Sequence, residues 1–400
     1  MHCLISKEKI DPFHIFEKRT ILNKPVRDLP EIATTSMELG YCKNTSHISS
    51  RLGLTDEKIA SIHEEIYTKL YETYAEIGLS PLQKSYTDFV AKWLLKSMKK
   101  NSSVLEIGCH DGYLLSKIAK EGHAVTGLEP SPMANFAKDN FGINVQNEFF
   151  TKESLNGEKF DFIILRHVIE HVQDPVEFLQ NAYGKLNKNG LIYIEVPNSL
   201  WSLTNSFFPE FHIDHISYFT QASLKKLILT LRNVEILHLE QFMGYIKFPF
   251  LGALIRKTNI ENSINYPQNH MQDFIIPNAI NKFTQDYANY INNLKSIDSS
   301  EGIVVWGTGS IGTQFSVDAD WGNDNENVYY VDINRSNHGM IISTTGHKIF
   351  SPEIIKKIKP SSVIVASAWE SDVLNQMQQF LSGREKIITY TSLLENNNDK

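Results

Sequence analysis

Short apolar runs separated by helix-type spacing dominate the chain from residue 103 onward. "SVLEIG", "HAVTGLE", "FDFIIL" and "LIYIEV" form a first series. "GIVVWGTG", "VYYVDI", "SSVIVAS" and "KIITYTSL" form a second. Runs of this length suit buried strands, and strands alternating with helices are typical of parallel sheets. The pattern predicts an α/β protein with two doubly wound modules.

The segments outside these two series have a different pattern of apolar and polar residues. Residues 1–53 show short extended pieces and few helix signals, which predicts a small irregular N-terminal module. Residues 55–100 have helical spacing, with Thr55 as a candidate N-cap and a break at Pro81. In the Asn-rich segment 258–298, apolar residues recur at helical spacing. We expect three parts, residues 1–75, 76–245 and 246–400, the last including a linker helix.

Composition narrows the class of protein. The chain has 400 residues, 42% of them apolar, and a net charge of −7, with no basic stripe to favour a nucleic-acid partner. No apolar run reaches the roughly 18 residues of a membrane span. Three cysteines in a chain of this length indicate a reducing compartment and no disulfide framework. We expect a cytoplasmic protein without a membrane partner, either a monomer or a weak homodimer.

A glycine turn follows the first strand of the first series. "VLEIGCHDGYLL" places Gly108 and Gly112 between a buried strand and a helix. Glycines let a ligand approach the backbone, and a helix start offers free N–H groups. Glu129 ends the next strand, where a carboxylate can accept hydrogen bonds from both hydroxyls of a ribose. Many α/β proteins carry such a turn, so by itself it indicates only a nucleotide-like ligand.

The order of the later segments adds specificity. Asp161 precedes "FIILRHVIEHVQDP", and a helix then leads to "LNKNGLIYIEVPN". This order resembles the class I S-adenosylmethionine-dependent methyltransferases. The resemblance implies an enzyme that uses S-adenosylmethionine, and a Rossmann-like module for another nucleotide is the alternative. The residues implied to bind the cofactor are Glu106, Gly108, Gly112, Glu129, Arg166 and His167.

The segment "FHIDHISYFTQASLKKLI" narrows the resemblance. It follows "EVPN" and is similar to a stretch of the sugar C-methyltransferases of deoxysugar pathways, which reads like H-E-H-[LI]-x-Y-F-S. "VVWGTGSIGTQ", near the C-terminus, also resembles the last module of that family. The resemblance implies methyl transfer to a carbon atom of a nucleotide-linked ketosugar.

The histidines of this segment suit that chemistry. A sugar carbon becomes a nucleophile only after it loses a proton beside a ketone, and an imidazole with a pKa near ~6.5 can accept that proton. The resemblance makes His215 the base, and Asp214, where the family has Glu, the group that orients its imidazole. His212 stands where the family often has Tyr and would donate to the enolate oxygen. Tyr74 lies in an aromatic stretch that closes over the site in the family. The alternative is a strand edge with solvated polar residues.

Two places in the chain are candidates for a metal. The family carries two C-x-x-C pairs for structural zinc, but here Cys3 is paired with Ser6 and Cys42 with Thr45. Hydroxyls are poor zinc ligands, so we expect a degenerate module that folds without metal. Histidines also flank Glu170 at a spacing that could bind metal, but no third ligand stands near them in the sequence. We predict no metal.

The second glycine turn matches a dinucleotide fingerprint. "GTGSIG" contains Gly307, Gly309 and Gly312, and Asp332 follows the next strand. Taken alone, this pattern predicts NAD binding. The family resemblance implies instead that the module keeps the Rossmann shape and holds the sugar nucleotide.

The acceptor is the least determined part of the prediction. Where the family often has Gly-Gly-Ser-x-Arg, this chain has "FMGYIKFPF", so contacts to the substrate differ. One alternative is an O- or N-methyltransferase that acts on a polysaccharide sugar precursor. The other is a non-catalytic protein that binds a sugar nucleotide or a dinucleotide.

Overall fold

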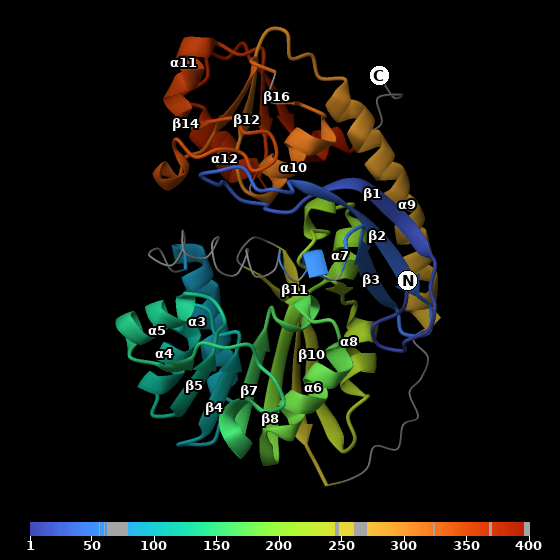
Figure 1. Ribbon diagram of the computed structural model, residues 1–400, viewed down its shortest axis with the longest axis vertical. Helices are drawn as coiled ribbons and strands as arrows, with labels where there is room; N and C mark the ends of the chain where they lie inside the picture. Colours follow the sequence, from blue (N-terminus) through green and yellow to red (C-terminus); the bar gives the residue numbers. More distant parts are fainter. Residues whose placement is uncertain are drawn as a thin grey trace.

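The computed structural model describes residues 1–55, 57–59, 61, 79–244, 248–259, 270–322, 325–367 and 370–395. Tyr74 and both expected domain boundaries lie outside these residues. Within them, three sheets are arranged one above another, with the N-terminal sheet between the other two (Figure 1). No helix of the described chain is long and apolar enough to cross a membrane.

The largest sheet has seven strands in the order β10-β11-β8-β7-β4-β5-β6. β4 to β8 are parallel to their neighbours, and β11 joins β8 antiparallel. The central strands therefore end at one common edge. The strands are β4 (Ser103–Ile107), β5 (Ala124–Leu128), β6 (Asn144–Gln146), β7 (Phe160–Arg166), β8 (Leu186–Pro197), β10 (Val234–Met243) and β11 (Pro249–Lys257).

Helices cover both faces of this sheet, which explains why its central strands β4 and β7 are mostly apolar and buried. Val104 and Phe162 pack into the core under α3, α4 and α5, whereas Leu105 and Ile163 pack into the core under α6 and α8. The doubly wound fold predicted for this part is confirmed. Its helices are α3 (Pro81–Leu95), α4 (Tyr113–Lys120), α5 (Met133–Phe141), α6 (Pro175–Gly184), α7 (Ser199–Thr204) and α8 (Gln221–Ile228), with 3₁₀ turns η2 (Ser154–Gly157), η3 (Ile169–His171) and η4 (Phe208–Glu210).

The C-terminal sheet is a second parallel sheet, in the order β14-β13-β12-β15-β16. All four predicted apolar runs of the second series are strands in it. Its elements are β12 (Ile303–Trp306), α10 (Ser310–Asp318), β13 (Val328–Val331), η5 (Arg335–Asn337), β14 (Ile349–Phe350), η6 (Pro352–Ile354), α11 (Ile355–Ile358), β15 (Ser362–Val365), α12 (Glu370–Met377), β16 (Lys386–Thr389) and α13 (Tyr390–Leu393).

The N-terminal part is more regular than its sequence indicates. β1 (Pro12–Thr20), β2 (Thr34–Cys42) and β3 (His47–Leu52) form an antiparallel sheet. The two-residue strand β9 (Ser217–Tyr218) completes this sheet, because Tyr218 pairs with Ile48 of β3. A segment from the middle of the chain is thus bound into the N-terminal sheet.

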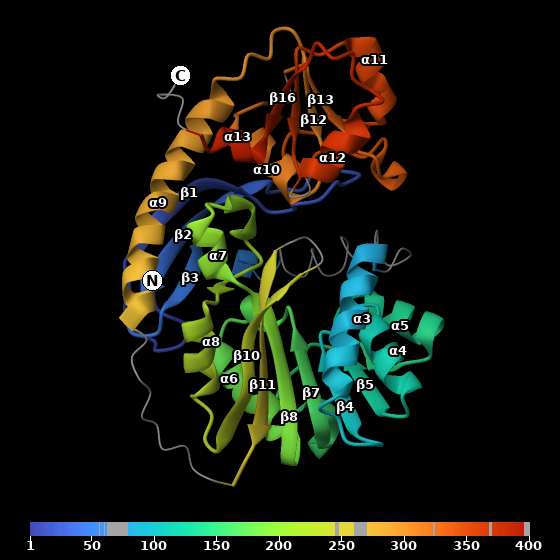
Figure 2. The ribbon, with the colours of Figure 1, turned by 180° about the vertical axis from the view of Figure 1, so that it is seen from behind.

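The long helix α9 (His270–Lys295) corresponds to the amphipathic helix predicted in the Asn-rich segment. Figures 1 and 2 show it running from the N-terminal sheet to the C-terminal module. Phe283 and Tyr287 pack against Phe16 of β1 and Phe208 of η4. One continuous apolar cluster therefore joins these parts.

Candidate functional site

The first glycine turn is sterically restricted to glycine. Gly108 and Gly112 have φ values of +73° and +72°, a region that side chains with a Cβ rarely adopt. A Cβ on Gly108 would lie 2.5 Å from Val168 Cγ2, and one on Gly112 would lie 2.7 Å from Ala137 Cβ. The turn therefore brings its backbone close to neighbouring segments at the carboxyl edge of the large sheet.

A cavity of about 1210 Å³ opens at this edge. Gly112, at the other end of the turn, is not part of the cavity wall. Asp214, from the histidine segment, and His171, from η3, also line the cavity. Of the predicted cofactor residues, five line it: Glu106, Gly108, Glu129, Arg166 and His167.

Glu106 is a buried carboxylate in the cavity wall that lacks part of its hydrogen bonding. It is 3% exposed, and its Oε2 atom has no hydrogen-bond partner. Burial raises its pKa to about 8, although Arg166 acts in the opposite direction. A ligand that brings a positively charged donor would satisfy this oxygen.

Glu129 keeps acceptor capacity toward the same cavity. Its Oε2 accepts a hydrogen bond from the backbone N–H of His110, and its Oε1 from that of Ser131, both at 2.9 Å. A carboxylate has about four lone-pair sites, so two donors leave both oxygens able to accept further bonds. This arrangement fits the two hydroxyls of a ribose.

Arg166 and His167 are held by a buried carboxylate. Arg166 Nε lies 3.0 Å from Glu195 Oε1, and His167 Nε2 lies 3.2 Å from the same oxygen. Burial raises the pKa of Glu195, but Arg166 and His167 outweigh it and lower that pKa to about 2. Burial lowers the pKa of His167, but Glu170 and Glu195 outweigh this effect and raise that pKa to about 9. Both predicted residues are thus cations at neutral pH, paired with protein carboxylates.

The histidine segment is a turn rather than a strand. Its backbone becomes a strand only at Ser217, so the strand-edge alternative does not describe it. His212 Nδ1 lies 3.2 Å from Asp214 Oδ1. The contact partner of His215 is instead Glu210 of η4, with 3.4 Å between His215 Nδ1 and Glu210 Oε1.

The sequence prediction paired Asp214 with His215, and the structure pairs these residues differently. Adjacent residues direct their side chains apart, so Asp214 contacts the histidine two positions before it. Glu210 was missed because nothing in the spacing of residues 210 and 215 indicates contact. Only the 3₁₀ turn that ends at Glu210 and the following bend bring the two side chains together.

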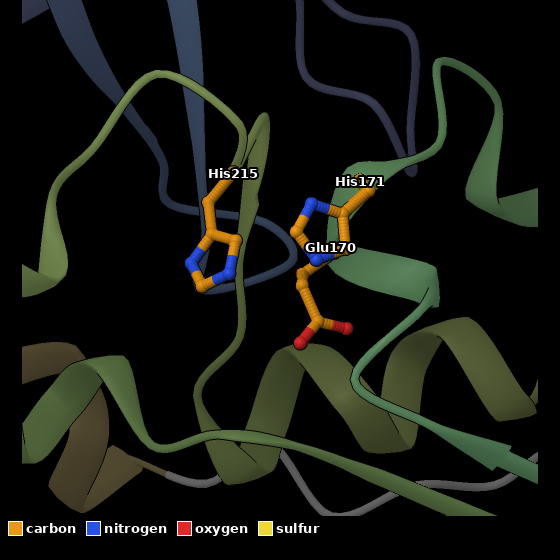
Figure 3. Close-up of side chains that lie close together, drawn as sticks. All are labelled: Glu170, His171 and His215. Carbon is orange, nitrogen blue, oxygen red and sulfur yellow. The ribbon is translucent and has the colours of Figure 1, made fainter. Parts of the chain in front are cut away.

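His171 connects the histidine segment to the cavity. Its Nδ1 lies 2.7 Å from the carbonyl oxygen of Asp214, and its ring centroid lies 4.8 Å from that of His215. Figure 3 shows the two rings side by side, with the carboxylate of Glu170 below them. His215 itself does not line the cavity, whereas His171 and Asp214 do. The glycine turn and the histidine cluster thus meet at one cavity.

Glu170, His171 and His215 also form the one three-residue cluster of metal-ligand type in the described part of the chain. Their ligand atoms lie within 4.8 Å of one another. Ligands of tetrahedral zinc lie only about 3.4 Å apart, as follows from bonds of about 2.0–2.2 Å. The side chains would have to move together to hold an ion, and the absence of metal stays a prediction.

The degenerate C-x-x-S and C-x-x-T pairs come together at one place. Cys3 Sγ lies 3.3 Å from Thr45 Oγ1, and Cys42 Sγ lies 3.6 Å from Ser6 Oγ. Cys42 also donates a hydrogen bond to Glu8 at 3.1 Å. A hydroxyl group thus lies beside each of these two thiols.

The acid of the second glycine turn is bonded mainly within its own module. Asp332 Oδ2 accepts hydrogen bonds from the backbone N–H and hydroxyl of Thr308 and from Asn337, and Oδ1 accepts one from the N–H of Asn334. These bonds occupy Oδ2 fully and leave one lone pair on Oδ1. The ribose-binding role that the NAD alternative requires would have only that lone pair to use.

Comparison with known proteins agrees with this geometry. Residues 80–239 match a family described as a methyltransferase domain. This part of the chain therefore matches a methyltransferase domain. This match covers the glycine turn, Glu129 and the histidine segment, and it does not reach the N-terminal sheet or the C-terminal module. The predicted cofactor agrees with it, whereas the sugar acceptor receives no support from it.

Curated relatives match only part of their own length. The ubiquinone biosynthesis O-methyltransferase of Azorhizobium caulinodans is 33% identical over 105 residues, covering 25% of this chain and 42% of the relative. The enzyme of the same name from Histophilus somni is 30% identical over 139 residues, covering 31% and 56%. The chain thus spans about half the length of these relatives.

Solved structures show weaker similarity. Magnesium protoporphyrin IX methyltransferase from Synechocystis, with bound S-adenosylhomocysteine, is 14% identical with a TM-score of 0.41, covering 51% of this chain and 100% of that one. The N-methyltransferase NodS from Bradyrhizobium japonicum is 17% identical with a TM-score of 0.36, covering 44% and 88%. The assignment of the fold rests on the strand order described above.

Proposed function

We propose that the protein transfers a methyl group from S-adenosylmethionine to a carbon atom of a nucleotide-linked ketosugar, with His215 as the general base. The observation that carries this proposal is the shared cavity of about 1210 Å³, which has the glycine turn on one side and His171 and Asp214 on another. Ligand pockets commonly measure ~300–1,000 Å³, so this one has room for a cofactor and an acceptor together.

The cofactor would be held by residues that still lack partners. Glu106 has an unsatisfied oxygen for the ammonium group of the methionine part, and Glu129 has free lone pairs for the ribose. Without a Cβ at Gly108, a ligand can approach the backbone there. This would suit the part of S-adenosylmethionine between its ammonium group and its ribose. Bound S-adenosylmethionine supplies a methyl group on a positively charged sulfur.

His215 has the protonation state that a base requires. Burial and the nearby His212 and His171 keep its pKa well below the usual value, so the imidazole is neutral at neutral pH. The C–H bond beside the ketone breaks, and its proton passes to the imidazole. The electron pair left on carbon forms the new C–CH₃ bond as the S–CH₃ bond breaks.

An oxygen acceptor is the second candidate, because the curated relatives are named O-methyltransferases. A hydroxyl group also loses a proton on methylation, but it does not require activation of a C–H bond. Exchange of a carbon-bound proton with solvent therefore distinguishes the two reactions.

The test uses purified protein, S-adenosylmethionine and a panel of nucleotide ketosugars, with mass spectrometry of the products. We expect a methylated product, and we expect His215→Ala to lose turnover by ~10²–10⁴-fold while keeping cofactor affinity. The wild-type protein should exchange the proton beside the ketone for solvent deuterium when the demethylated cofactor is bound. His238→Ala, an exposed histidine on β10, is the matched control and should change neither value.

Turnover of ketosugars by His215→Ala at the wild-type rate would contradict the role of His215. Methylation of oxygen without exchange of the carbon-bound proton would establish the second candidate instead.

A further inference from the structure

Two carboxylates lie in the segment that leads to His215, and they occupy different environments. Asp214 lies in the cavity wall, and its carboxylate contacts His212. Glu210 is 9% exposed, does not line the cavity, and lies against His215, which is itself 7% exposed. Only Glu210 contacts a ring nitrogen of the proposed base.

The contact joins two atoms that have no other hydrogen-bond partner. Glu210 Oε1 and His215 Nδ1 are both buried and otherwise unsatisfied, and they lie 3.4 Å apart. A shift of a few tenths of an ångström brings them to ordinary hydrogen-bond length. Because an unpaired buried polar atom is unfavourable, the pair has a physical reason to close.

We propose that Glu210 is the positioning residue that sets which nitrogen of His215 carries the hydrogen. This inference rests on the proposed role of His215 as the base. When the Glu210 carboxylate accepts a bond from Nδ1–H, the lone pair lies on Nε2, which can then accept a proton. When Glu210 is protonated and donates to Nδ1, the hydrogen lies on Nε2 and the ring cannot act as a base there.

The surroundings make the ionisation of Glu210 the controlling event. Burial raises its pKa to about 8, while His212 and His167 act against that rise and Glu170 adds to it. Proton abstraction should therefore increase as the pH rises through about 8. The titratable and charged groups that face the pair come from β1, the residue after β7, η3, β9 and the same turn: Arg19, His167, Glu170, His171, His212, Asp214 and Tyr218.

The decisive experiment is nitrogen-15 NMR of the histidine rings, which identifies the protonated nitrogen without any substrate. Signals of His215 are assigned by their loss in His215→Asn. In the wild-type protein we expect the Nε2–H form at pH 6 and the Nδ1–H form above pH 8. Glu210→Gln should remove the change of ring form with pH, because its amide does not ionise and can either donate to Nδ1 or accept from it. Asp214→Asn, the matched control, should titrate like the wild type.

Kinetics on a nucleotide ketosugar test the consequence. We expect Glu210→Gln to lower kcat by ~10²–10³-fold with a KM within about threefold of wild type, and to remove the rise with pH. Glu210→Asp should restore part of kcat, and Asp214→Asn should lose less than about tenfold.

The two hypotheses fail in different ways. If Glu210→Gln keeps the wild-type ring signals and rate while His215→Ala is inactive, Glu210 does not position the ring. His215 then remains the proposed base. If no ketosugar is turned over or exchanged, the proposed function fails, and the ring signals still decide the role of Glu210. If Glu210→Gln does not fold, the pH titration of the wild-type ring decides it: a ring that stays in one form from pH 6 to 9 overturns the inference.

Discussion

The two glycine turns of this chain look alike in sequence and differ in structure. Each follows a buried strand, opens a helix, and has an acidic residue after the next strand. Glu129 accepts two hydrogen bonds and faces a cavity, whereas Asp332 accepts four from its own module. Glu129 thus keeps a free acceptor site on each oxygen, whereas Asp332 is used mainly within its own module.

The difference extends to the charges around each turn. The edge of the large sheet holds the charge of the half-buried Arg166 and that of the buried Glu195 beside the cavity. Around Asp332, the bonded partners are the hydroxyl and amide groups of Thr308 and Asn337. The first turn therefore lies beside charged side chains that a charged ligand could contact. At the second turn, the one acidic side chain is hydrogen-bonded by neutral groups of its own module.

The largest expected effect comes from removing a buried charge beside the first turn. Arg166→Met removes one of the two cations that pair with the buried Glu195 and leaves only His167 beside it, so we expect the free energy of unfolding to fall by about 3 kcal/mol at pH 7. Because the pKa of Glu195 is lowered to about 2, its stabilising contribution is present above its usual value of 4.5 and is lost as the pH falls toward 2. Urea denaturation at pH 7 measures the loss of stability, and the same experiment at lower pH measures its pH dependence.

Arg256→Met is the control, since Arg256 and Glu235 form an exposed pair on the same sheet, with 3.1 Å between the charged groups. Its effect should stay below about 1 kcal/mol. If Arg166→Met and Arg256→Met lost equal amounts of stability, the charges beside the first turn would have no special role.

The glycines of the two turns should respond differently to a methyl group. Gly108→Ala combines a positive φ, worth about 1–2 kcal/mol, with a clash against Val168, worth about 1–3 kcal/mol. We expect the affinity for S-adenosylmethionine to fall by at least ~10-fold, measured by calorimetry. Gly309→Ala, which has open space around it, should leave that affinity unchanged. A comparable loss in Gly309→Ala would place the cofactor at the wrong turn.

The two acids provide a more moderate comparison. Glu129→Ala should weaken binding of S-adenosylmethionine by about 1.5–3 kcal/mol, the usual value for hydrogen bonds to a charged group. Asp332→Ala should leave this affinity at the wild-type value and instead lower the melting temperature, because Thr308 and Asn337 lose their acceptor. Weaker cofactor binding by Asp332→Ala would contradict the expected difference between the two acids.

The smallest effect concerns the pH dependence of cofactor binding. The ionised form of Glu106 should bind the ammonium group of S-adenosylmethionine, and its pKa is raised to about 8. The ionised fraction therefore grows with pH, and affinity should rise up to about tenfold between pH 6 and 7, which corresponds to ~1.4 kcal/mol. Glu106→Gln should show a flat profile. A flat profile in the wild type would exclude Glu106 as the acceptor.

The sequence predicted the parallel strands of these two sheets because many of them are buried on both faces and appear as apolar runs. It did not predict the antiparallel strands β10 and β11, which extend the large sheet. It did not predict the N-terminal sheet, because β1 mixes buried Phe16 with exposed charged residues over an irregular pairing. Helix α9 was predictable from apolar residues at helical spacing.

The candidate site was predictable where neighbours in sequence are neighbours in space, as in the turn from Gly108 to Gly112. Contacts that depend on the path of a loop were not. Glu210 reaches His215 through a 3₁₀ turn, and Asn337 reaches Asp332 through η5. Arg166 and Glu195 meet because β7 and β8 are adjacent and in register, which no local pattern reports.

The pairing of β9 with β3 limits how far this protein can be treated as a set of exchangeable parts. The strand that begins two residues after His215 belongs to a sheet formed by the first fifty or so residues, and Ser50 donates a hydrogen bond to the carbonyl oxygen of His215 itself. A catalytic core excised at the limits of residues 80–239 for grafting onto another scaffold would keep its cofactor turn. It would leave behind the strand and the hydroxyl that hold the backbone at His215, the proposed base, so recombination in the laboratory or in evolution has to move both segments together.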